Sequence, residues 1–134
     1  MNELTVRLLA TPQAAPMLRH AVREHLGPES GDAELCVTEL LANVVRHLGE
    51  GTPVTLRISG RATRTRVELT DPAPAARPAP REAAGDDESG RGLALLDALA
   101  LRWGVSQGQG TKTVWCELDP GHSRRGRVAV ITDG

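Results

Sequence analysis

Three polar side chains recur along one predicted helix at a spacing that could serve phosphate chemistry. Glu39, Asn43 and His47 follow one another four residues apart, which places them on one side of an α-helix. The amide oxygen of Asn43 is a neutral ligand that suits Mg2+, a cation that takes few protein ligands besides phosphate oxygens and waters. A nearby carboxylate such as Glu39 could position or deprotonate an attacking hydroxyl group. From the spacing alone, an ordinary solvated helix face is the more frequent explanation.

A fourth candidate, Asp71, ends a predicted strand and stands directly before Pro72. Aspartate before proline is most often a turn residue. The carboxylate of Asp71 could instead accept a hydrogen bond from the amino group of adenine. Position alone leaves both roles open.

A short glycine motif, Gly90-Arg91-Gly92, precedes a predicted helix that begins at Leu93. Glycines permit close approach of the backbone, and the free amides at a helix N-terminus attract phosphate. Arg91 could add charge to such a site. A plain glycine turn would explain the motif at least as often, because short glycine patterns have high false-positive rates.

The elements that must position these residues follow from the hydrophobic pattern. Apolar residues recur at helical spacing between residues 30 and 48, after Gly27-Pro28 has ended a preceding helix. Alternation of apolar and polar residues predicts strands, among them a hairpin that ends on Asp71. In order, the sequence predicts a strand at 4–9, helices at 12–26 and 30–48, strands at 53–59 and 64–70, a helix at 93–101 and strands at 103–107 and 111–118.

Residues 72–89 change to proline, alanine, glycine and charged residues, which predicts a long loop inside the domain. Loops of this length are often lids over a site, although an inert insert has the same composition. The element order predicts an α+β fold, a two-layer α/β sandwich with a mixed sheet covered by helices on one face. We expect one domain at residues 1–118 with a lid at about 72–90. A polar tail at 119–134 could add an edge strand.

Composition narrows the function classes. The 134 residues carry 16 basic and 17 acidic side chains, so no overall field favours nucleic acid or an acidic membrane surface. The aromatic residues are Trp103 and Trp115 alone, too few for a base-stacking platform. Cys36 and Cys116 lack metal or disulfide spacing and are expected to be buried reduced thiols. The N-terminal residues lack the pattern of a secretory signal, so we expect a soluble cytoplasmic protein.

Taken in order, these segments resemble the GHKL superfamily of ATPases, most closely its bacterial anti-sigma-factor serine kinases and stand-alone histidine-kinase-like ATPase domains. Residues 39–47 resemble the N box, Asp71 the start of the first glycine box, Gly90-Arg91-Gly92-Leu93 the second and residues 110–115 the closing glycine box. The likeness spans Leu4 to Leu118. Pro72-Ala73-Pro74-Ala75 stands where the family often has alternating glycines.

The resemblance implies a Bergerat-type fold that binds ATP and Mg2+. By it, Asn43 would ligate Mg2+, Glu39 would be the catalytic base or orient the hydroxyl, and His47 would lie near the phosphates. Asp71 would read adenine with support from Thr113, and Gly90, Arg91, Gly92 and Leu93 would hold phosphate.

The implied partners are a sigma factor and a small anti-sigma-factor antagonist protein that is phosphorylated on serine. A homodimer is also implied, and nucleic acid and membranes are not expected partners. Two alternatives stay open: a nucleotide-dependent protein-binding module without transferase activity, and an interaction domain that binds no nucleotide.

Overall fold

The computed structural model describes residues 3–61, 63–72, 94–108 and 110–119. Within these ranges every predicted helix and strand is present, with ends that differ by a few residues. The elements are β1 (Leu4–Ala10), α1 (Ala14–Leu26), α2 (Gly31–Leu48), β2 (Thr52–Arg61), β3 (Arg64–Asp71), β4 (Arg102–Gln107) and β5 (Lys112–Leu118). Residues 94–99 are helical. The expected lid, the residues 90–93 and the tail strand lie outside the described residues.

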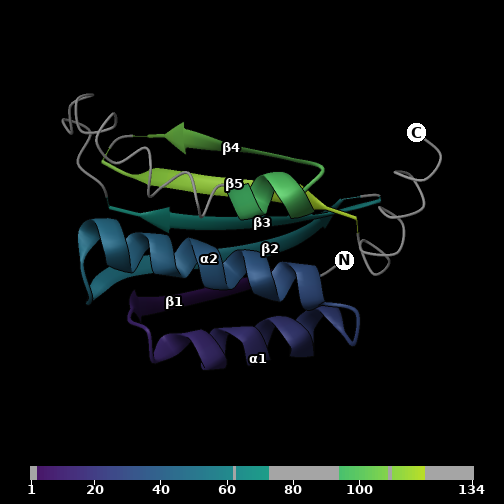
Figure 1. Ribbon diagram of the computed structural model, residues 1–134, viewed down its shortest axis with the longest axis horizontal. Helices are drawn as coiled ribbons and strands as arrows, with labels where there is room; N and C mark the ends of the chain where they lie inside the picture. The colour runs from purple at the N-terminus through teal and green to yellow at the C-terminus, as the bar shows by residue number, and fades with distance from the viewer. Residues whose placement is uncertain (1–2, 62, 73–93, 109, 120–134) are drawn as a thin grey trace.

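The five strands form one sheet in the order β1-β2-β3-β5-β4. All four strand pairings of the described residues are antiparallel, so the expectation of a mixed sheet was wrong. The helical segment at 94–99 does return the chain so that β4 runs parallel to β3, but β5 lies between these two strands (Figure 1). The two parallel strands therefore never pair.

One face of the sheet carries the core. Both helices and the helical segment at 94–99 lie on the same side of the sheet (Figure 1), and alternate strand residues point toward them. The largest fully buried side chains are Leu18, Val22, Val37, Leu41, Leu56, Ile58, Val67 and Leu96, with Cys36 and Cys116. Burying one such side chain stabilises by about 1.5–3 kcal/mol, more than an exposed ion pair contributes. No described helix is both long enough and apolar enough to cross a membrane.

The two cysteines lie in this core as free thiols, as predicted. Cys36 comes from α2 and Cys116 from β5, and both are fully buried. Contact with the Cys36 thiol, together with burial, raises the pKa of Cys116 well above its ordinary value. The Cys116 thiol is therefore neutral and packs as a small apolar side chain.

An ion pair fixes α2 against α1. Arg23 on α1 donates from Nε and Nη2 to the two carboxylate oxygens of Glu34 on α2, at 3.2 and 3.0 Å. Ser30, just before α2, donates to Glu34 Oε2 at 2.6 Å. The hydrogen bond from Arg23 lowers the pKa of Glu34 despite the opposing effect of burial. Bidentate contact of this kind adds orientation as well as energy, and it helps to hold α2 over the sheet.

The face of the sheet away from the helices has its own polar cluster, centred on the carboxylate of Glu117. Three arginines donate to it: Arg64 at 3.2 Å, Arg66 at 3.1 Å and Arg102 at 2.8 Å. The guanidinium of Arg66 also lies 4.3 Å from the centre of the Trp115 ring. Although the Glu117 side chain is only 7% exposed, the hydrogen bond from Arg102 and those from the other two arginines lower its pKa to about 2.

The Glu117 cluster predicts a loss of stability in acid. The folded pKa of Glu117 lies below its ordinary value of 4.5, so its contribution is complete above that value and is lost as the pH falls from about 4.5 to about 2. Glu117→Gln should lower the free energy of unfolding near neutral pH by about 1–3 kcal/mol, and it should flatten the decline in acid. Urea unfolding at several pH values measures both, with the exposed Glu24→Gln as control. An equally steep acid decline in Glu117→Gln would contradict the assignment.

Gly104 on β4 predicts a second stability effect, through close packing. A Cβ at residue 104 would lie 2.8 Å from Cζ2 and 3.0 Å from Cε2 of Trp115, distances at which the ring must shift. Gly104→Ala should therefore destabilise the fold by about 1–3 kcal/mol, whereas Ser106→Ala on the same strand should change stability by less than about 0.5 kcal/mol. Thermal unfolding measures the difference. The cost should shrink in the Trp115→Leu background, and an unchanged cost there would locate the strain elsewhere.

Candidate functional site

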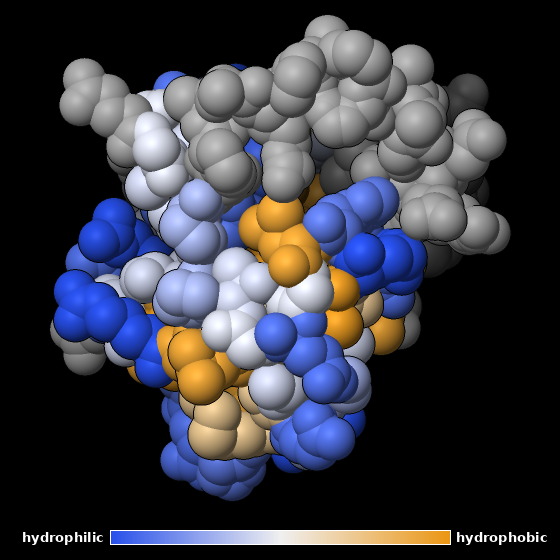
Figure 2. Space-filling model, turned by 90° about the vertical axis from the view of Figure 1, so that its left-hand side faces the viewer, coloured by the Kyte–Doolittle hydropathy of each residue, from blue (hydrophilic) through white to orange (hydrophobic). Residues whose placement is uncertain are grey.

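An enclosed pocket lies where α2 and β3 end and β5 begins. Figure 2 views this end of the molecule and shows apolar patches within a largely hydrophilic surface. The pocket combines apolar walls with a few polar groups; it is lined by Leu40, Asn43, Val44, His47, Leu48, Leu69, Asp71, Lys112 and Val114. Apolar walls with few convergent polar groups are typical of a small-molecule site.

α2 brings two of the predicted residues to this pocket. Leu40 and Val44 are buried against the sheet, and the helical repeat places Asn43 and His47 beside them at the pocket wall. Asn43 is half-buried and His47 is exposed. The amide oxygen of Asn43 accepts a hydrogen bond from Nη2 of Arg46 at 2.7 Å, so this oxygen already faces a positive charge.

β3 and β5 supply a pair of opposite charges. Asp71 and Lys112 are register partners at the ends of the two strands, and their side chains lie on the helix side of the sheet, with Leu69 and Val114. The ammonium nitrogen of Lys112 is 3.9 Å from Oδ2 of Asp71, whose side chain is 2% exposed. A buried carboxylate needs such compensation, because an unpaired buried charge is costly.

The structure brings together some of the predicted site residues and not others. Asn43, His47 and Asp71 share the pocket. Glu39 lies one helical turn earlier on α2, half-buried and outside the pocket lining. Thr113 is on the opposite face of the sheet, where its hydroxyl lies 2.7 Å from that of Thr70. Residues 90–93, from Gly90 to Leu93, are outside the described residues.

Lys112 is the site residue that sequence reasoning missed. Lys112 occupies the position on β5 that faces Asp71. The family resemblance had assigned the role of supporting Asp71 to Thr113. The alternation of residues along β5 could have identified Lys112. Val114 and Cys116 point into the core, and Lys112, two residues before Val114, points to the same face. Because successive side chains of a strand point to opposite faces, Lys112 faces the pocket and Thr113 faces the outer side of the sheet.

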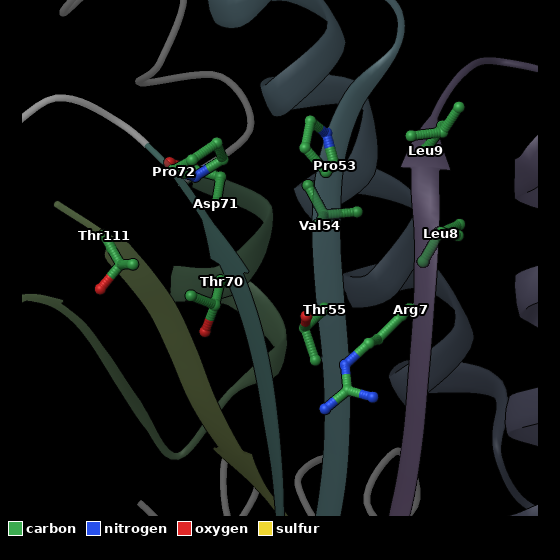
Figure 3. A pocket seen from close by; sticks show the side chains of 10 residues that line it. All are labelled: Arg7, Leu8, Leu9, Pro53, Val54, Thr55, Thr70, Asp71, Pro72 and Thr111. Carbon is green, nitrogen blue, oxygen red and sulfur yellow. The ribbon is translucent and has the colours of Figure 1, made fainter.

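A second and larger hollow, of about 510 Å³, lies on the opposite face of the sheet. Figure 3 shows Arg7 reaching from β1 across β2 beside Thr55, with Thr70 and Thr111 on the far side and Leu9, Pro53 and Pro72 at one end. Asn43 and His47 do not line it. This open hollow is larger and also has polar lining residues, among them Arg7, Thr70 and Asp71. The enclosed pocket is the better candidate because it joins Asp71 to Asn43 and His47 of α2.

The enclosed pocket has the chemistry of a site for a flat heterocycle that carries an amino group. Asp71 offers a buried acceptor, and apolar side chains of α2, β3 and β5 form the walls. Asn43 also lines the pocket, and an amide oxygen is a group that could act as a neutral ligand for a hard cation. The pocket has a volume of about 30 Å³, so its lining matches a nucleotide site in chemical groups, and a base would enter only after lining side chains move aside.

Two solved structures have the same fold at low sequence identity. One contains the RsbU and RsbW domains of Rv1364c from Mycobacterium tuberculosis, with a TM-score of 0.62 and 19% identity over 87% of this chain. The other is the histidine kinase domain of the blue-light activated histidine kinase from Erythrobacter litoralis EL346, with a TM-score of 0.52 and 18% identity over 85% of this chain. This chain covers 32% of the first structure and 63% of the second.

Sequence comparison identifies the family. A Streptomyces coelicolor protein, the uncharacterised SCO4941, is 51% identical over 83 residues, which are 60% of this chain and 79% of that protein. The profile of the family described as histidine kinase-like ATPase domain matches residues 8–117. That match includes every described residue of the enclosed pocket, so this chain belongs to the family of histidine kinase-like ATPase domains.

Proposed function

We propose that this chain binds Mg-ATP and transfers the γ-phosphoryl group to a serine or threonine of a small antagonist protein, thereby controlling the capture of a sigma factor. The observation that carries the proposal is the convergence of Asn43, His47 and Asp71 in one enclosed pocket of a domain from an ATPase family. The fold likeness to a protein with an RsbW domain supports it at the level of architecture.

Asp71 is the residue that reads the base. Its carboxylate is buried at the end of β3 between apolar side chains, where a hydrogen bond from the exocyclic amino group of adenine is worth more than in water. A hydrogen bond to a charged group contributes about 1.5–3 kcal/mol. The adenine ring would pack against the apolar walls, which include Leu40, Val44 and Leu69.

Asn43 is the residue that would hold the cation. Mg2+ takes few protein ligands and keeps waters and phosphate oxygens, so one amide oxygen from α2 is a sufficient protein contribution. Bound Mg2+ supplies positive charge that neutralises the phosphates. The amide oxygen of Asn43 accepts a hydrogen bond from Arg46 at 2.7 Å. The guanidinium of Arg46 would have to move away before Mg2+ could bind to this oxygen.

Glu39 stands where a protein hydroxyl rather than the nucleotide would reach it. Four residues of helix correspond to about 6 Å along the axis, which sets Glu39 back from Asn43 and outside the pocket. In the transfer, the substrate hydroxyl oxygen bonds to the γ-phosphorus as the bond to the ADP oxygen breaks. The hydroxyl proton passes to Glu39, which orients the hydroxyl beforehand.

The phosphorylated antagonist would account for regulation of the sigma factor. Phosphorylation adds about −1.5 to −2 charges to the antagonist, and in this scheme the added charge releases the antagonist from the kinase. The freed kinase surface then holds the sigma factor. Two exclusive partners on one small domain amount to a switch set by phosphate.

A module that binds protein partners in response to nucleotide, without transfer, is the second candidate. It is favoured by two observations: Glu39 does not line the pocket, and the oxygen of Asn43 accepts a hydrogen bond from Arg46. Both candidates require nucleotide binding and differ only in transfer. The two experiments below therefore test binding first and chemistry second.

Mg-ATP should raise the melting temperature of the wild-type chain, since a ligand at about 100 times its Kd stabilises by about 2.7 kcal/mol. Asp71→Asn should weaken ATP binding about tenfold to hundredfold by removing a charged acceptor. Asn43→Ala should abolish the dependence of binding on Mg2+ while leaving binding of the base. Calorimetric titration with and without Mg2+ measures these effects, with Gln13→Ala, a change to an exposed amide that lines neither pocket, as control. A wild-type chain that gives neither heat nor thermal shift with Mg-ATP would refute the nucleotide site.

Glu39→Gln should reduce phosphoryl transfer about 100-fold or more, as expected for a general base, and should leave the Kd for Mg-ATP unchanged. Transfer of radiolabelled γ-phosphate to candidate antagonist proteins is the measurement. Glu50→Gln, which removes an exposed carboxylate just beyond α2, is the matched control. Tight ATP binding by the wild-type chain with no transfer to its cognate partner would establish the binding module instead.

A further inference from the structure

An ion pair narrows the enclosed pocket at the residue proposed to read the base. The ammonium nitrogen of Lys112 lies 3.9 Å from Oδ2 of Asp71, and both side chains line the pocket. The volume beside them is about 30 Å³, which has room for about one or two water molecules and is too small for a purine base. A base that is to reach Asp71 must therefore displace part of the lining.

Lys112 can leave the pocket at little cost, unlike the apolar side chains that line it. Leu40, Val44 and Leu69 belong to the hydrophobic core and are no more than 6% exposed, so moving any of them would expose apolar surface to water. The Lys112 side chain is 31% exposed and carries its charge on a flexible four-carbon stem. Rotation of that stem moves the ammonium into solvent without disturbing the sheet.

We propose that Lys112 is a displaceable stand-in for the amino group of adenine: it holds the Asp71 carboxylate in place until the base arrives, and then turns outward so that the base takes its position. This inference rests on the proposed nucleotide site and names the side chain that admits the base. Lys112 is a positioning residue in this scheme, because it acts through Asp71 and does not touch the bound nucleotide.

The exchange gives Asp71 a favourable partner at both stages. A carboxylate that is 2% exposed needs positive charge or hydrogen-bond donors nearby, because a buried charge without compensation is costly. Lys112 supplies positive charge, and at 3.9 Å its contact is an ion pair rather than a hydrogen bond. The amino group of adenine can donate a hydrogen bond to the same carboxylate. A looser contact is thus replaced by a closer one.

The exchange also lowers the apparent affinity for ATP. A ligand that binds one of two conformations has its affinity reduced by the fraction of molecules in that conformation. If Lys112 lies against Asp71 in about nine of ten molecules, ATP binds about tenfold more weakly than it would to an open pocket. Removal of the Lys112 side chain should therefore strengthen ATP binding, whereas removal of a side chain that contacts ATP weakens it.

Two variants with opposite expected effects test the proposal. In Lys112→Ala, the Kd for Mg-ATP should fall about threefold to tenfold, while the melting temperature without nucleotide should drop by about 2–8 °C because Asp71 loses a counter-charge. In Lys112→Arg, the guanidinium can bind the carboxylate through two hydrogen bonds, so the melting temperature should be retained and the Kd should rise about threefold or more. Calorimetric titration and thermal unfolding measure both quantities. Arg7→Ala, which removes an exposed cation on the other face of the sheet (Figure 3), is the matched control and should change neither.

The outcomes separate this inference from the proposed function. A wild-type chain that binds no Mg-ATP refutes both. If the wild-type chain binds Mg-ATP and Lys112→Ala binds it no more tightly, the role of Lys112 is wrong and the nucleotide site stands. Lower stability with unchanged binding would identify a purely structural ion pair, and weaker binding would identify contact between Lys112 and the nucleotide.

A second measurement uses the wild-type chain and does not depend on the folding of a variant. Lys112 is the one lysine of the sequence, so an amine-specific acetylating reagent has Lys112 and the α-amino group as its targets. Saturation with Mg-ATP should raise the rate of acetylation of Lys112 about threefold or more relative to the α-amino group, because the ammonium then points into solvent. Mass spectrometry of the peptides measures both rates. An unchanged or slower rate at Lys112 with bound nucleotide would overturn the proposal.

Discussion

The antiparallel register between β3 and β5 is the constraint on which the site depends. Side chains alternate across a sheet with a period of two, so the pairing of Asp71 with Lys112 sends both toward the helices. The same register sends Thr70 and Thr113 to the opposite face, where their hydroxyls meet at 2.7 Å. A slip of β5 by one residue would turn Lys112 to the opposite face and leave the buried Asp71 without this partner. Hydrophobic residues farther along both strands, such as Val67 and Cys116, prevent that slip because they fill the core.

α2 completes the site from the other layer. Its buried residues, among them Val37, Leu41 and Val44, fix its rotation against the sheet, and the ion pair between Arg23 and Glu34 fixes it against α1. With rotation and position set by packing, Asn43 can reach only one place at the pocket wall. The apolar residues of α2 thus determine where the polar residues on the neighbouring side of the helix lie.

Local patterns in the sequence predicted most of the elements and three of the residues that line the enclosed pocket, Asn43, His47 and Asp71. The helical repeat around Leu40 and Val44 and the glycines that bound α2 act within a few residues, so α2 could be placed without tertiary information. The end of β3 at Asp71 followed from alternation in the same way. The insertion of β5 between β3 and β4 depends on long-range pairing, and so the sheet was expected to be mixed. The glycine-box motif favours Thr113 as the partner of Asp71, whereas the alternation of side chains along β5 places Lys112 there. The burial of Glu117 under three arginines depends on residues from β3 and β4 that no local pattern brings together.

The face of the sheet away from the helices carries mostly polar side chains that can contact water. Across this face the register partners Arg7, Thr55, Thr70, Thr113 and Ser106 form one row, and Glu117 with its arginines covers the region farther along. A sheet face that is hydrophobic must be covered by further helices or by another chain, whereas hydroxyl groups and paired charges are compatible with water. This face can therefore stay in contact with water, and the helices of the described residues all lie on the side of the sheet that carries the enclosed pocket.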